Sequence, residues 1–275
     1  MRKYLCILTV LILAACTPQL PDSPETLVVE GWIENDAAPM VFITSSISAT
    51  FREQGITDLI GHLATTATAS ITCDGVKYPL TPAINDDYVL PLCYTSNTLK
   101  GVTGSTYLLQ VDWKGMHAEA TTTIPAPAGI DSIAVEHHPY DDTLYIVKAH
   151  IVPAPGVRYY RFFSMTAGRD STYGPSYIGT FDSQLHADEM AAVNRSTQNP
   201  IRYDGHYHCM GDSVLFKLAS IDSTAYQFWN AFDESGIFSH AALIPYSSNL
   251  KGNLTGALGY FFGYGISPYA VTIKK

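Results

Sequence analysis

The sequence has little positive charge. Lys and Arg together number 16, against 25 Asp and Glu, so the chain carries a formal net charge of −9. Proteins bind nucleic-acid phosphates with clusters of Lys and Arg, and no such cluster occurs along this chain. The composition therefore argues against a nucleic-acid partner.

Long hydrophobic runs are also scarce. The apolar stretch at residues 4–13 follows Arg2 and Lys3 and is too short to cross a bilayer as a helix. It ends in small residues followed by Cys16, an order typical of a secretory signal that closes in a lipobox. We predict that residues 1–15 are a lipoprotein signal peptide and that Cys16 receives a diacylglycerol. An ordinary signal peptide followed by a chance cysteine is the alternative.

Cysteine is rare, with five copies in the chain. Loss of the signal peptide and lipidation of Cys16 would leave Cys73, Cys93 and Cys209. In an oxidising compartment Cys73 and Cys93 could form a disulfide worth about 3 kcal/mol by loop-closure entropy. Two small buried thiols are the alternative, because connectivity does not follow from sequence.

The composition favours strands. Charged residues make up only 15% of the chain, whereas Tyr occurs 18 times. Tyrosine is enriched in β-strands, because its side chain packs well on a pleated surface. The proline-rich residues 16–25 predict an extended tether. Residues 26–125 contain about seven short strands and predict an immunoglobulin-like β-sandwich. Hairpins are predicted across Asp74-Gly75 and, with the clearest period of two, at 107–124 across Lys114-Gly115.

A linker of sequence Pro-Ala-Pro-Ala-Gly at residues 125–129 predicts a domain boundary. Residues 130–275 are predicted to form a second β-rich domain with one or two short helices. Asp222 or Ser223 is the expected N-cap of the clearer helix, at about 223–233, whose apolar stripe faces a core. A second short helix is predicted near 187–193. The fold class is therefore mainly β.

Catalytic motifs are missing. Gly211-Asp212-Ser213-Val214 resembles the start of a GDSL esterase block, but no Asp-x-x-His follows to supply the base. The serine also opens a predicted strand instead of a strand-to-helix turn. We predict no catalytic residues, no enzymatic activity and no cofactor.

Two groups of side chains are candidate binding residues. Asp204, His206 and His208 alternate, so a strand would place them on one face as a three-ligand metal edge; a solvated polar loop is the alternative. The aromatic clusters predict a surface that stacks on a ligand or partner, although such rings more often fill a core. The tyrosines of this predicted surface are Tyr159, Tyr160, Tyr260 and Tyr264.

The order of the motifs resembles a known family. The motifs are residues 27–33 soon after the lipobox, 121–125 followed by 130–133, 211–214, 220–229, and 256–265. They resemble the Bacteroidota outer-membrane lipoprotein family labelled domain of unknown function four-two-four-nine. The resemblance covers nearly the whole mature chain, except residues 166–200, and it provides no catalytic residues. It implies an anchor in the outer membrane and a gene often beside a TonB-dependent transporter.

Two function classes follow from these observations. The first is an accessory or ligand-capture lipoprotein of a TonB-dependent transporter in nutrient uptake, with its lipid anchor in the outer membrane. The second is a cell-surface adhesin or carbohydrate-active lipoprotein on the same scaffold, because a fold does not fix a function.

Overall fold

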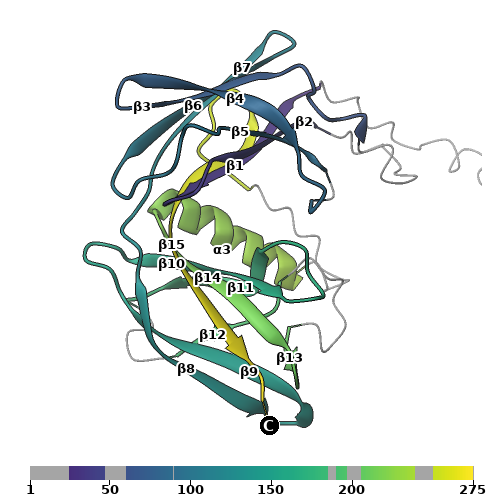
Figure 1. The fold of residues 1–275 in the computed structure, drawn as a ribbon, viewed down its shortest axis with the longest axis vertical. Helices are drawn as coiled ribbons and strands as arrows, with labels where there is room; N and C mark the ends of the chain where they lie inside the picture. The colour runs from purple at the N-terminus through teal and green to yellow at the C-terminus, as the bar shows by residue number, and fades with distance from the viewer. Residues whose placement is uncertain are drawn as a thin grey trace, which may run out of the picture.

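The computed structural model describes residues 25–46, 60–88, 90–184, 190–196, 206–238 and 250–274. Within these ranges the fold is mainly β, as predicted, and the helix α3 lies between an upper and a lower half (Figure 1). The predicted signal peptide, Cys16 and the tether up to residue 24 lie outside these ranges. No helix in the described part of the chain combines the length and hydropathy needed to cross a membrane.

The N-terminal half of the protein, which we call the first body, is a β-sandwich formed by one continuous sheet that curves back on itself. Its two ends approach each other, because Glu119 and the backbone at Thr255 exchange hydrogen bonds of 2.9 and 3.0 Å. Leu27, Val29 and Ile33 lie fully buried inside the curl. In sheet order the strands are β15 (Leu258–Thr272), β1 (Leu27–Glu34), β2 (Met40–Ser45), β5 (Leu92–Thr95), β4 (Val76–Ile84), β3 (Thr68–Cys73), β6 (Thr106–Trp113) and β7 (Met116–Thr123).

The predicted hairpins form with the predicted turns. β3 and β4 pair from Cys73–Val76 outward across Asp74-Gly75, and β6 and β7 pair from Trp113–Met116 across Lys114-Gly115. All four turn residues have positive φ angles, the conformation that two-residue hairpin loops of this type require.

The second body contains two sheets and a helix. The sheet of β11, β10, β14 and the C-terminal half of β15 packs on a smaller sheet around β9, and Val147, Phe162 and Phe216 are fully buried between them. The further elements are β8 (Gly129–His138), β9 (Asp141–Val152), β10 (Tyr159–Thr166), β11 (Gly174–Asp182), β12 (Ala191–Val193), β13 (His208–Cys209), β14 (Ser213–Ile221) and α3 (Ser223–Phe238).

The predicted helix at 223–233 is confirmed, and it extends to Phe238. Its N-cap is Asp222, whose Oδ1 accepts a hydrogen bond of 2.7 Å from the Ala225 backbone N–H. The helix predicted near 187–193 is wrong where the structure describes it, because Ala191–Val193 forms β12 and pairs with β9.

One strand joins the two bodies. The first half of β15 runs parallel to β1, from Val28–Leu258 to Glu34–Tyr264, and the second half pairs antiparallel with β14, from Ser220–Gly265 to Ser213–Thr272 (Figure 1). The sequence predicted separate closing strands, all within residues 130–275. The C-terminal strand instead completes the sheet of the N-terminal sandwich as well.

Glycines allow this crossing. A Cβ added at Gly263 would lie 2.7 Å from the Thr123 carbonyl oxygen, and one at Gly265 would lie 2.2 Å from the Pro125 carbonyl oxygen. Only glycine tolerates such close approach of two backbones. The glycines near the C-terminus therefore let β15 pass close to the backbone at Thr123 and Pro125.

The possible disulfide between Cys73 and Cys93 does not form, and both thiols are free. Cys73 pairs with Val76 at one end of β4, whereas Cys93 pairs with Ala83 near its other end. Seven residues of strand separate those positions by about 23 Å, far beyond the roughly 7 Å that a disulfide spans between Cα atoms.

Candidate functional site

The outer face of β1 is partly covered by the second body of the protein. Alternate residues of the strand, including Val29 and Ile33, fill the sandwich core, so Glu30 and Trp32 point to the opposite side. On that side Trp32 packs against the buried cluster that α3 forms with β15. The outer face of the sandwich therefore becomes the wall of a junction between the two bodies.

Four partly exposed aromatic side chains lie along this wall, and we call them the aromatic face: Trp32, Phe42, Tyr88 and Tyr260. The ring centroid of Phe42 lies 5.9 Å from that of Trp32 and 5.0 Å from that of Tyr88. Tyr260 stacks on Phe262 at 5.0 Å, and Phe262 is the register partner of Trp32. Burial raises the pKa of Tyr88 to about 12, so its hydroxyl stays protonated.

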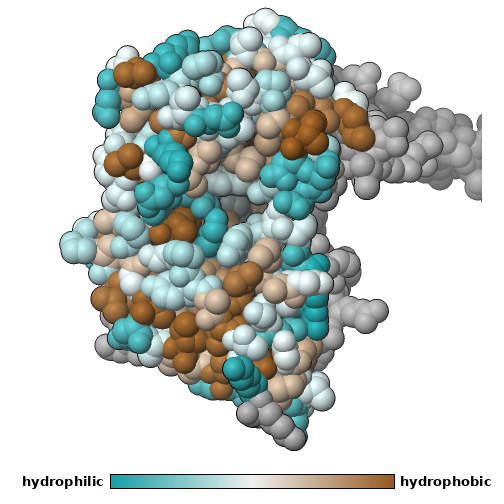
Figure 2. Space-filling view, in the orientation of Figure 1, coloured by the Kyte–Doolittle hydropathy of each residue, from teal (hydrophilic) through white to brown (hydrophobic). Residues whose placement is uncertain are grey.

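Glu30 is the carboxylate of this face. Its register partners are Phe42 on β2 and Tyr260 on β15, so its side chain emerges between two aromatic rings. Water reaches the side chain, yet the protein around it raises the pKa of Glu30 by desolvation. Figure 2 shows a hollow in the surface between the two halves of the molecule.

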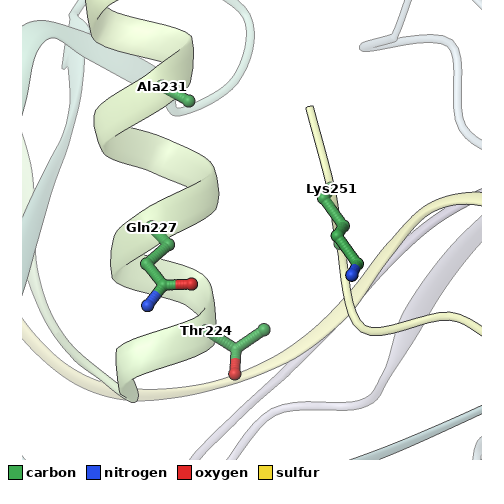
Figure 3. Close-up of a pocket in the computed structure, with 5 residues that line it drawn as sticks. Thr224, Gln227, Ala231 and Lys251 are labelled. Atoms are coloured by element: carbon green, nitrogen blue, oxygen red, sulfur yellow. The ribbon is translucent and has the colours of Figure 1, made fainter. Parts of the chain in front are cut away.

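A pocket adjoins the junction on the α3 side. It has a volume of about 370 Å³ and is lined by Thr224, Gln227, Ala231, Lys251 and Gly252. Figure 3 shows the helix side chains facing the segment that carries Lys251. Gly252 lies against the backbone of Gly259 and Tyr260, which brings the pocket beside the aromatic face.

A buried ion pair fixes α3 in position. The Arg161 guanidinium, on β10, donates hydrogen bonds of 2.9 and 3.1 Å to the two carboxylate oxygens of Asp233 on the helix. Trp229 covers the guanidinium at 4.3 Å. Thr180 on β11 contributes its backbone N–H to Asp233 and accepts a further bond from Arg161. This network holds the helix, and with it Phe228, against Tyr260 at 4.8 Å.

The tyrosines predicted as a ligand surface divide into three groups. Tyr160 and Tyr264 are buried, which contradicts the prediction. The Tyr160 hydroxyl bonds the backbone of Val157 and Ala154, and the Tyr264 hydroxyl accepts a bond of 3.0 Å from Trp229. Tyr159 stacks on Tyr226 at 4.3 Å, and only Tyr260 belongs to the aromatic face.

The predicted metal ligands do not come together in the described part of the chain. The His206 ring stacks on Tyr177 at 3.4 Å, and the buried His208 uses Nε2 to donate a 2.8 Å bond to the Val193 carbonyl. Burial also lowers the pKa of His208. Asp204 lies outside the described residues, and within them no three His, Cys, Asp or Glu side chains form a set that could hold a metal ion.

Two aromatic residues in the sequence already indicated the aromatic face, although it was not predicted. Trp32 and Phe42 both occupy positions of period two that a single sandwich leaves to solvent. Large aromatic rings at solvent positions on two neighbouring strands indicate a covered or ligand-binding face. The missing information was that these two strands lie beside β15.

Replacing Glu30 by Gln is expected to stabilise the fold at neutral pH. Because the pKa of Glu30 is raised in the native state, the folded protein holds a proton that the unfolded chain has released at pH values between the two pKa values, and above both the carboxylate is charged in either state. Stability therefore falls as pH rises from the ordinary glutamate pKa through the raised one, and Glu30→Gln removes that loss.

Urea unfolding of both proteins at about pH 7.5 and at about pH 4 measures the effect, which should shrink at the lower pH as Glu30 takes up its proton. Glu119→Gln, at an exposed position on β7, is the matched control. A Glu30→Gln variant that is less stable than the parent at neutral pH would show that the carboxylate supports the fold.

Comparisons with known proteins identify a family but not an activity. A family model described as "Domain of unknown function (DUF4249)" matches residues 15–269. No curated protein matches the chain. Thirty-six chains of solved structures match; one is the crystal structure of chicken CNTN1 FN1–FN3 domains, with 10% identity, coverage of 93% of this chain and 69% of that chain, and a TM-score of 0.27.

Proposed function

Because the chain belongs to the family described as domain of unknown function (DUF4249), as its motifs predict, we propose that it is an outer-membrane lipoprotein that captures a ligand for a TonB-dependent transporter. The lipobox at Cys16 supports the anchor, and the family resemblance supports the partner. The aromatic face is the observation that carries the capture role.

The aromatic face suits capture for a physical reason. Trp32, Phe42, Tyr88 and Tyr260 are each only partly buried, so they keep apolar area that a ligand can cover. Rings of this kind contribute large contact area at low conformational cost. Trp32, Phe42 and Tyr260 belong to paired strands, Tyr88 lies in the connection between β4 and β5, and the buried ion pair between Arg161 and Asp233 holds the opposing helix. Such a rigid frame limits the entropy lost on binding.

Replacing Cys16 by Ala is expected to release the protein from the membrane or to stall its processing. Several acyl chains on one cysteine exceed the two signals that stable anchoring needs, and the variant has none. Fractionation of cells into soluble and outer-membrane material measures the change. Cys209→Ala removes a thiol that is free in the structure and should leave the protein in the membrane. A processed Cys16→Ala protein that stays wholly in the outer membrane would contradict the anchor.

The partner is tested by purifying the tagged, lipidated protein from outer membranes in mild detergent. We expect a TonB-dependent transporter to co-purify in a stoichiometric amount, and deletion of the gene to lower uptake of one substrate class. An isolated protein with hydrolytic or cell-binding activity would favour the adhesin or carbohydrate-active alternative. Trp32→Ala should reduce uptake without releasing the partner, because the aromatic face serves the ligand.

A further inference from the structure

Glu30 differs from the neighbouring carboxylate on the same strand. Glu34, also on the outer face of β1, accepts bonds of 2.9 and 2.7 Å from the Lys217 ammonium. Glu30 has no hydrogen bond or ion pair with any described residue, and desolvation alone accounts for its raised pKa. The Glu30 carboxylate is thus an unpaired, partly desolvated acidic group between the register positions of Phe42 and Tyr260.

An uncompensated carboxylate in such a place attracts a cation. Its charge is costly while it is unpaired and partly stripped of water, and a bound positive group offsets that cost through a charge-assisted hydrogen bond. The neighbouring rings act in the same direction, since the faces of Trp, Tyr and Phe attract ammonium and guanidinium groups. Trp32, Phe42 and Tyr260 supply these faces.

Other ligand classes fit less well. An anion would meet the repulsion of Glu30. A hard divalent ion needs several oxygen ligands, and the described residues bring together no set of three groups able to hold a metal ion. A neutral sugar could use the Trp32 indole N–H and the hydroxyls of Tyr88 and Tyr260, but it would leave the Glu30 carboxylate without a charged partner.

We propose that the aromatic face binds a small organic cation, with an ammonium or guanidinium group at Glu30 and the apolar part of the ligand on the rings of Trp32, Phe42, Tyr88 and Tyr260. This assignment rests on the proposed capture function and names its substrate class.

Calorimetric titration of the full-length protein in detergent tests the assignment with a matched pair of probes. Tyramine carries an aromatic ring and an ammonium group, and tyrosol replaces that ammonium by a hydroxyl. We expect tyramine to bind at least about tenfold more tightly, because a hydrogen bond between two charged groups is stronger than one to a neutral hydroxyl. Agmatine should also bind, and methyl glucoside should not.

The variant Glu30→Gln should lose about tenfold or more in tyramine affinity while leaving the weak binding of tyrosol unchanged. Folding is not at risk, because the Glu30 carboxylate forms no bond with a described residue. Glu119→Gln should bind tyramine like the parent protein.

Four outcomes would overturn the cation assignment. Equal binding of tyramine and tyrosol, or full tyramine affinity in Glu30→Gln, would show that the charge plays no part. Binding of methyl glucoside that depends on Trp32 would replace the cation by a carbohydrate and leave ligand capture in place. If no probe binds, the cation class is wrong, and the capture function then depends on the co-purification result.

Discussion

Replacing Asp233 by Ala is expected to destabilise the protein by about 3–5 kcal/mol, the usual cost of removing one partner of a buried ion pair. Arg161 is fully buried, and Asp233 is only 7% exposed. Without the carboxylate, the guanidinium keeps a charge that it cannot return to water. Chemical denaturation followed by circular dichroism measures the change in the free energy of unfolding.

Two further variants separate the ion pair from the general effect of substitution in α3. Glu234→Ala alters the next, exposed residue of the helix and should change the free energy of unfolding by about 0.5 kcal/mol or less. Combining Arg161→Met with Asp233→Leu removes both charges and should recover most of the loss, because no unpaired charge remains. A cost below about 1 kcal/mol for Asp233→Ala would contradict a buried, water-excluded ion pair between Arg161 and Asp233.

Replacing Phe228 by Ala is expected to cost about 3–5 kcal/mol, the range for truncating a buried phenylalanine. Phe228 is 6% exposed, and its ring lies 4.8, 5.2 and 5.6 Å from the rings of Tyr260, Trp229 and Phe262. Thermal and urea unfolding measure the loss.

The variant Phe228→Leu fills most of the same volume and should retain most of the stability. A loss under about 1 kcal/mol for Phe228→Ala would place this side of α3 at a ligand or partner surface instead of in a core. The Phe228→Ala protein should also show a less ordered Tyr260, because the two rings support each other.

Local features of the fold followed from local sequence. Asp74-Gly75 and Lys114-Gly115 correctly predicted two hairpins, and Asp222 was one of the two residues predicted to start α3. These predictions succeeded because turn and cap chemistry depends on a few adjacent residues. The mainly β class followed from composition and alternation.

The features that create the candidate site are not local. Val28 pairs with Leu258, but the local sequence of neither strand indicates which other strand it pairs with. Arg161 alternates with Tyr160 and Phe162 and therefore reads as a solvent-facing residue, yet α3 covers it. Tyr264 was predicted as a ligand-surface residue from its aromatic cluster alone, yet it is buried and its hydroxyl bonds Trp229 on α3.

The most direct test of ligand capture is a nitrogen–proton correlation spectrum of the three tryptophan indole groups. Trp113 lies buried in the sandwich core, Trp229 donates its Nε1–H to Tyr264, and Trp32 is partly exposed on the aromatic face. The probes are a tryptic digest of casein and a hydrolysate of yeast mannan. The account predicts that at least one of them shifts the Trp32 signal while the Trp113 signal stays in place. Signals that all remain unchanged, or a shift of Trp113 without Trp32, would contradict ligand capture at this face.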